Sequence, residues 1–116
     1  MGNKVIMKCP VHKIEMSKTL TQYGYRYDCP ELTCTMMCWG GQTSTPADKE
    51  TRDLRIQAHA LFDNLNMSKG KRYRWMQKQM GISPRKAHIG MFNAQQCKQL
   101  IGLIQENENT DIHSSD

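Results

Sequence analysis

The spacing of apolar side chains changes near residue 43. Before this point the chain has few large apolar residues and no helical periodicity, so apolar burial alone would not fold the segment. Beyond it, apolar residues recur at helical spacing, as on the buried face of a helix. This change predicts an α+β protein, in which a small module of β-hairpins is followed by a bundle of three to four short helices.

The first predicted helix follows the loop-like residues 40–44. Thr45 is expected to cap it and Pro46 to take its first position, where a backbone amide hydrogen is not needed. Its buried stripe is expected to contain Leu54, Ala58, Leu61 and Leu65. His59 has no second metal-competent side chain one turn away, so we expect it on the helix surface or in packing rather than on a metal.

Two further helices are predicted in the middle of this half. Ser68 should cap the longer one, which runs to about Met80 and ends at Gly81. Ser83–Pro84 repeats the cap and first-turn signature and predicts a short helix closed near Gly90. This order of elements fits a helix-turn-helix, and it fits equally the corner of any small helical bundle.

The last predicted helix has Asn93 as its cap, with Gln96 at the position of the reciprocal partner in a capping box. Its buried stripe is expected to contain Cys97, Leu100, Ile101 and Ile104. Residues 107–116 are polar and acidic, and we expect them to form a disordered tail.

Strand chemistry dominates residues 13–28. Tyr23, Tyr25 and Tyr27 recur at every second position, and threonines before them also favour extended backbone. Because successive side chains of a strand point to opposite faces, all three tyrosines are expected on one face of a strand.

Two pairs of metal-competent side chains lie in this N-terminal module, Cys9 with His12 and Cys29 with Cys34. Each pair places two ligands on one tight turn, and two such turns complete the tetrahedral shell that Zn²⁺ prefers. We therefore predict that residues 1–43 form a zinc ribbon with Zn²⁺ as structural cofactor. The metal would contribute on the order of 10 kcal/mol to a module with little apolar core.

The fifth cysteine leaves the ligand set open, because Cys34 and Cys38 also have a permissible spacing. Cys34 is favoured since it gives one pair on each of two turns, whereas ligation by Cys38 would leave Cys34 unused close to the metal. A disulfide framework is disfavoured because the number of cysteines is odd and because such frameworks belong to secreted chains.

Length and hydropathy suggest three parts in the 116 residues: a zinc-ribbon module at 1–43, a helical domain at 44–106 and the acidic tail at 107–116. No apolar run approaches the roughly 18 residues of a membrane span, and the apolar stretch after Lys4 is too short for a signal peptide. We expect a cytoplasmic protein with no membrane partner, in a compartment that keeps thiols reduced.

Charge is separated along the chain, whose net charge is +5. Residues 64–105 contain eight basic residues and no acidic one. Such a face attracts polyanions, although a basic surface also helps a protein to stay soluble. We predict binding of DNA or RNA through Lys69, Lys71, Arg72, Arg74, Lys78, Arg85 and Lys86. Trp39 and Trp75 could stack on bases, but burial is the commoner fate of tryptophan.

A family resemblance is carried by several strings of residues: Cys9 and His12 (where relatives more often have two cysteines), Cys29, Cys34, Ala58–Asp63, Tyr73–Met76, His88–Asn93 and Cys97. Through them the chain resembles, over most of its length, the zinc-finger-containing domain family of phage and prophage proteins, a domain of unknown function. The second ligand pair is also similar to that of the C-terminal zinc ribbons of bacterial topoisomerase I, which bind single-stranded DNA. The resemblance implies a phage-type origin and a two-part layout, and supplies no activity.

Two functions fit these features. The first is non-enzymatic binding of nucleic acid through the basic helical face, and the second is that of a phage effector that binds a host protein and inhibits or redirects it. An enzyme is not expected, because a four-ligand zinc site has no open position for water. The sequence also places no carboxylate pair, and no nucleophile with a base, at a useful spacing.

Overall fold

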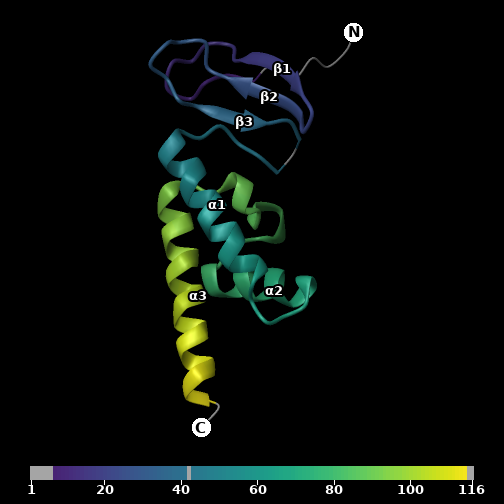
Figure 1. The fold of residues 1–116 in the computed structure, drawn as a ribbon, viewed down its shortest axis with the longest axis vertical. Helices are drawn as coiled ribbons and strands as arrows, with labels where there is room; N and C mark the ends of the chain where they lie inside the picture. The colour runs from purple at the N-terminus through teal and green to yellow at the C-terminus, as the bar shows by residue number, and fades with distance from the viewer. Residues whose placement is uncertain (1–6, 42, 115–116) are drawn as a thin grey trace. The chain divides into compact units, whose positions relative to one another are not determined.

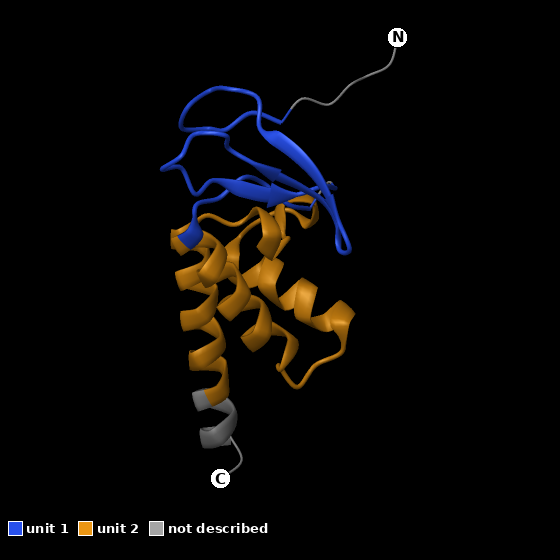
Figure 2. Ribbon diagram, turned by 45° about the horizontal axis from the view of Figure 1, so that its top comes forward, with its two compact units in different colours: residues 1–49 blue, residues 50–116 orange. Residues whose placement is uncertain are grey.

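The computed structural model describes residues 7–41 and 43–114, with side chains described as far as residue 108. The chain divides into two compact units, Met1–Lys49 and Glu50–Asp116 (Figure 2). The first unit contains a three-stranded sheet and the second contains helices (Figure 1). This is the α+β architecture that the sequence predicts, with hairpins preceding the helices.

The sheet is antiparallel, with β2 between β1 and β3. Its strands are β1 Ser17–Thr21, β2 Gly24–Asp28 and β3 Met37–Trp39. The prediction of three tyrosines on one strand is wrong, because Tyr23 lies in the turn between β1 and β2. Gly24 has a φ of 113°, a conformation that favours glycine and lets the chain reverse there. Only Tyr25 and Tyr27 therefore share a strand and a face.

The helical elements are α1 Lys49–Asp63, α2 Lys69–Met80, the 3₁₀ turns η1 Pro84–Lys86 and η2 Ile89–Met91, and α3 Ala94–Ser114. α1 begins at Lys49, so the predicted start at Thr45 and Pro46 is wrong. Ala47 instead pairs with Met37, each donating its N–H to the other's carbonyl oxygen at 3.0 Å. This pairing holds the backbone extended up to the start of α1.

The ends of α2 are as predicted. The Ser68 side chain accepts a hydrogen bond from the N–H of Lys71, which caps the first turn. Gly81 adopts the left-handed conformation with a φ of 64° and donates its N–H to the Gln77 carbonyl. Both signals are local, so they operate without help from distant residues.

The short third helix is replaced by η1 and η2, and Gly90 lies inside η2 rather than at a helix end. Ala87, Ile89 and Phe92 are all buried in this stretch. One regular α-helix would not place positions 87, 89 and 92 on a single face, whereas a chain that bends between two short turns does so.

α3 starts with the predicted capping box. The Asn93 N–H donates to Gln96 Oε1 at 3.0 Å, and the Gln96 N–H donates to Asn93 Oδ1 at 2.8 Å. The helix continues to Ser114, whereas the sequence led us to expect disorder after residue 106. Once a buried stripe has formed the first turns, each added residue gains one hydrogen bond at little further cost.

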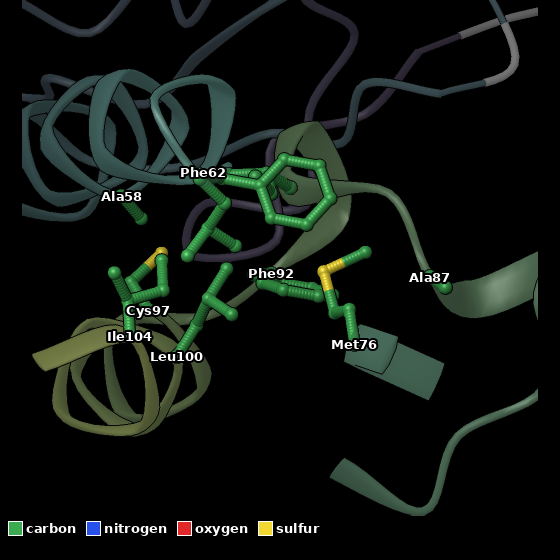
Figure 3. Close-up of a cluster of buried hydrophobic side chains, with 10 residues drawn as sticks. Ala58, Phe62, Met76, Ala87, Phe92, Cys97, Leu100 and Ile104 are labelled. Atoms are coloured by element: carbon green, nitrogen blue, oxygen red, sulfur yellow. The ribbon is translucent and has the colours of Figure 1, made fainter. Parts of the chain in front are cut away.

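The core of the helical unit is built around two phenylalanines (Figure 3). Phe62 on α1 and Phe92 after η2 are fully buried, and Figure 3 shows Cys97, Leu100 and Ile104 of α3 directed toward them. Phe62 also meets Tyr73 edge to face, with ring centroids 5.2 Å apart. The predicted core positions Ala58, Leu65 and Cys97 are buried in the same cluster.

Candidate metal centre and basic surface

The first pair of metal-competent residues lies in a small hairpin at residues 7–16. The Cys9 N–H donates to the Ile14 carbonyl at 2.9 Å, and the Lys13 N–H donates to the Cys9 carbonyl at 2.8 Å. Lys13 has a φ of 61°, which lets the chain reverse sharply just after His12. The turn thereby brings the side chains of Cys9 and His12 to one side.

The second pair lies in the loop that joins β2 to β3. Cys29 directly follows β2, and its N–H donates to the Met36 carbonyl at 3.1 Å, which keeps the two strands together beyond the sheet. Within the loop, the Cys34 N–H donates to the Glu31 carbonyl at 3.1 Å. This turn directs Cys34 back toward Cys29.

The four side chains converge on one point. The Sγ atoms of Cys9, Cys29 and Cys34 and a ring nitrogen of His12 all lie within 4.8 Å of one another. Cys9 Sγ is 3.7 Å from Cys34 Sγ and 3.8 Å from His12 Nδ1, and Cys29 Sγ is 3.5 Å from His12 Nδ1.

These distances fit a tetrahedral zinc shell. With Zn–S bonds of about 2.3 Å and Zn–N bonds of about 2.0 Å, the edges of the tetrahedron are about 3.8 Å between sulfurs and about 3.5 Å between sulfur and nitrogen. The donor set of three thiols and one imidazole is also typical of structural zinc sites. The residues present therefore fit the ion that the sequence predicts.

The thiols differ in acidity. Burial raises the pKa of Cys9, but hydrogen bonds from the backbone N–H and the ring of His12 outweigh this and lower the pKa to about 6. Burial and the neighbouring thiols raise the pKa of Cys29 to about 11. Thiols this close cannot all ionise without a compensating positive charge, which a divalent cation supplies.

An apolar shell surrounds the metal-competent group, by which we mean Cys9, His12, Cys29 and Cys34. This shell was not predicted from the sequence. Cys9, Cys29 and Met16 are buried together. Met7, Tyr27, Cys34 and Met36 pack against this cluster. The available signal was the position of Tyr27 and Met36, which lie two residues before Cys29 and two after Cys34. The shell excludes water from one side of the sulfurs and so strengthens their hold on a cation.

Cys38, Cys97 and His59 lie outside the four converging residues. Cys38 lies within β3 and is buried, but it is not among the four converging residues. Cys97 is fully buried in the helical core, and this burial raises the pKa of its thiol. His59 lies on the surface of α1, with Nδ1 3.0 Å from Asp63 Oδ2.

Residues 11–107 match the family described as the zinc-finger-containing domain. The matched span covers well over half of the chain. The chain belongs to this family. The span includes His12, Cys29 and Cys34 and begins two residues after Cys9. No curated protein and no solved structure matches the chain. Phage origin and the likeness to topoisomerase ribbons stay predictions.

Six of the seven predicted nucleic-acid-binding residues are exposed. The zinc-finger-containing domain carries four of them on α2, namely Lys69, Lys71, Arg74 and Lys78. The other two, Arg85 and Lys86, form part of η1. A side chain at Gly70 would lie 3.6 Å from Nη1 of Arg74, so that guanidinium sits over the first turn of α2.

Arg72 is the exception, since it is half-buried and serves the fold. Its Nη1 donates to the Met67 carbonyl at 2.8 Å, and its guanidinium lies 5.7 Å from the ring centroid of Phe62. Its Nε is buried without a hydrogen-bond partner among the described residues. Arg72 therefore ties the loop before α2 to the core, and it is not exposed as the other six predicted residues are.

The tryptophans occupy different settings. Trp75 packs partly buried against the core of the helical unit, and Trp39 on β3 remains partly exposed. Across the described residues, none of the helices is both long enough and apolar enough to cross a membrane.

Proposed function

We propose that this zinc-finger-containing domain is a non-enzymatic nucleic-acid-binding protein that contacts phosphates through the exposed basic side of α2. The observation that carries the proposal is a stripe of three exposed cations, Lys71, Arg74 and Lys78. Arg74 and Lys78 follow Lys71 by three and seven residues, so the three side chains lie on one side of the helix.

The charge at the N-terminal end of α2 opposes the stability of the helix. Its first turn carries Lys69 and Lys71 and no acidic residue, although a helix N-terminus is stabilised by negative charge and weakened by positive charge. Backbone N–H groups and lysines at the same end together favour a bound anion such as a phosphate. A surface that departs from the stabilising pattern in this way supports a binding role.

Zinc would have a structural role in this proposal. Cys9, His12, Cys29 and Cys34 would hold it, and the ion would supply a cross-link between the two turns of the first unit. Four protein ligands fill a tetrahedral shell, which supports binding rather than catalysis. None of the five cysteines forms a disulfide in the structure, which is compatible with the cytoplasmic location that we also propose.

The test replaces Lys71, Arg74 and Lys78 together by glutamine and measures affinity for single- and double-stranded DNA and RNA as salt is varied. Each phosphate that a cation neutralises releases counterions, so the slope of log K against log salt for a duplex should fall by roughly 0.9 for each phosphate that the variant no longer neutralises. Arg72 is left unchanged because its replacement would disturb the Met67 loop.

Lys98→Gln is the matched control, because Lys98 is exposed on α3 and its replacement lowers the charge of the same unit. Lys71→Gln, Arg74→Gln and Lys78→Gln are also made singly, and each should lower the slope more than Lys98→Gln does. If the wild-type protein binds no nucleic acid at low salt, the proposal fails. The basic side would then be a docking surface for a host protein. Affinity purification tests this, and a host protein that still co-purifies after nuclease treatment would support it.

A further inference from the structure

The hairpin of β1 and β2 exposes large side chains that neither the metal centre nor the helical core uses. Tyr23 in the turn is 78% exposed, Leu20 on β1 is 68% exposed and Tyr25 on β2 is 47% exposed. Leu20 and Tyr25 are direct cross-strand partners. Single exposed apolar residues are common on surfaces, but a cluster of them points to a contact surface.

The turn presents Tyr23 on ordered backbone. The Thr21 hydroxyl donates to the Gly24 carbonyl at 2.7 Å and accepts a hydrogen bond from the Tyr23 N–H at 3.1 Å. These two bonds fix the reversal between the strands. A ligand that contacts Tyr23 therefore loses little affinity to ordering of the loop.

A cation lies on the same face as Tyr25. The Nζ of Lys18 is 4.2 Å from the ring centroid of Tyr25 and 6.0 Å from that of Tyr27. Among the described residues Lys18 has no acidic partner. Residues 16–27 also contain no acidic side chain, so this end of the sheet is attractive to anions.

The edge of Tyr25 toward β3 is left uncovered by a glycine. The Gly40 N–H donates to the Tyr25 carbonyl at 2.9 Å, which places the two residues side by side. A Cβ at position 40 would lie 3.4 Å from Cβ of Tyr25 and 3.7 Å from Cε2 of Tyr27. A side chain there would pack on both tyrosines and reduce access to Tyr25.

The opposite face of the sheet has a different character. Arg26 is the cross-strand partner of the partly exposed Trp39. The guanidinium of Arg26 is paired with the Asp28 carboxylate at 3.0 Å, so its charge is neutralised within the sheet. An aromatic ring beside a cation without an acidic partner occurs only on the Tyr25 side of the described sheet.

From this arrangement we infer that the hairpin face, which consists of Lys18, Leu20 and Tyr25 on one side of the sheet together with Tyr23 in the adjoining turn, binds unpaired bases of a single-stranded nucleic acid. Tyrosine rings stack on bases of any sequence, and the Lys18 ammonium meets an adjoining phosphate. A duplex hides its base faces in its own stack and offers the rings nothing to stack on. An apolar protein groove would leave the ammonium and the tyrosine hydroxyls without partners.

This inference extends the proposed function to a second surface on a different unit, and either surface can fail alone. The first test uses Tyr25→Leu, which keeps an apolar side chain but removes the ring. Affinity for a labelled oligothymidylate of about 15 nucleotides should fall by about 5- to 150-fold, as expected for loss of one stacked base. Tyr25→Phe keeps the ring and should bind as the wild type does.

Leu32→Ala is the control for loss of an exposed apolar side chain, because Leu32 is fully exposed in the loop that holds Cys29 and Cys34. It should leave the affinity unchanged. Duplex affinity should also be the same for Tyr25→Leu and the wild type. Equal binding of the oligothymidylate by Tyr25→Leu and the wild type, or equal losses for Tyr25→Leu and Tyr25→Phe, would overturn the inference.

A second test uses only the wild-type protein, so it does not depend on the folding of any variant. Wild-type protein is titrated with oligothymidylate and with an abasic strand of the same length, which keeps the phosphates but has no bases. Stacking predicts markedly weaker binding of the abasic strand, and equal affinities would contradict it. Oligouridylate in parallel separates RNA from DNA as the source of the bases.

The salt dependence distinguishes this inference from the proposed function. Glutamine at Lys71, Arg74 and Lys78 should flatten the salt slope for every strand, while Tyr25→Leu should lower affinity for unpaired strands with its slope unchanged. If only the first effect is found, the hairpin face is not a stacking surface. If only the second is found, the α2 stripe is not the phosphate-binding surface.

Discussion

Cys34 and Cys38 show how backbone context decides which thiol reaches the metal-competent group. Cys34 lies in the loop before β3, where the chain is able to curve toward Cys29. Cys38 lies within β3, opposite Tyr27 on β2, and its side chain is buried by that register. A residue held in a strand cannot swing toward a site beyond the end of the strand without breaking ladder hydrogen bonds.

We expect Cys34→Ser to lose zinc and Cys38→Ser to retain it. A structural site that loses one of four ligands binds zinc far more weakly. Cys38 is not one of the four residues whose ligand atoms converge, so its loss should leave zinc binding intact. Metal content per chain, measured by atomic emission after purification without chelator, checks both. Retention by Cys34→Ser with loss by Cys38→Ser would place the fourth ligand at Cys38, and a wild-type protein without zinc would remove the site.

At the scale of single elements, the helices owe their ends to a few side chains. α2 is delimited by Ser68 and Gly81, and α3 starts with the reciprocal bonds between Asn93 and Gln96. α1 instead begins where the Ala47 pairing with Met37 ends. Helices closed by their own caps are predictable from local sequence, and a helix delimited by a strand contact is not.

The capping box of α3 predicts that Asn93→Ala destabilises the helical unit by about 1 kcal/mol, because the N–H of Gln96 loses its acceptor. Urea unfolding followed by circular dichroism measures this free energy. Gln95→Ala is the matched control, since Gln95 is exposed in the same turn and has no capping bond among the described residues. Equal stabilities of the two variants would show that the box contributes nothing.

At the scale of the whole molecule, the two units obtain their stability from different sources. The helical unit buries Phe62, Phe92, Met76, Leu100 and Ile104 in a continuous apolar core. The first unit buries mainly thiols and methionines around the metal-competent group. Its sheet is small, and a sheet of this size needs a further source of stability.

Removal of metal should therefore unfold the first unit and leave the second folded. We expect a chelator to abolish the near-ultraviolet circular dichroism of the tyrosines in the sheet while helical ellipticity in the far ultraviolet is retained, because binding free energy is folding free energy in such modules. Spectra recorded before and after chelation, with zinc added back, measure both signals. Helical ellipticity that falls together with the metal would show that the helical unit depends on the first.

The sequence by itself determined the features that arise from neighbouring residues. The paired spacing predicted that Cys9, His12, Cys29 and Cys34 would converge, and the structure brings them within 4.8 Å of one another. The ends of α2, the cap of α3 and the burial of Cys97 were also predictable. Each ligand pair, each helix end and the stripe that contains Cys97 is a signal within one turn or one helical period, so short-range geometry suffices for it. The meeting of the two pairs joins residues as distant as Cys9 and Cys34, and the sequence predicted it because a tetrahedral zinc shell needs four ligands.

Only the tertiary structure decided the features that join distant residues. Ala47 pairs with Met37 and shortens α1, and Arg72 turns toward Phe62. These outcomes depend on which partner a residue meets after the chain has folded. Burial and backbone pairing contribute more free energy than the helix or strand propensity of a single residue, so they override that propensity.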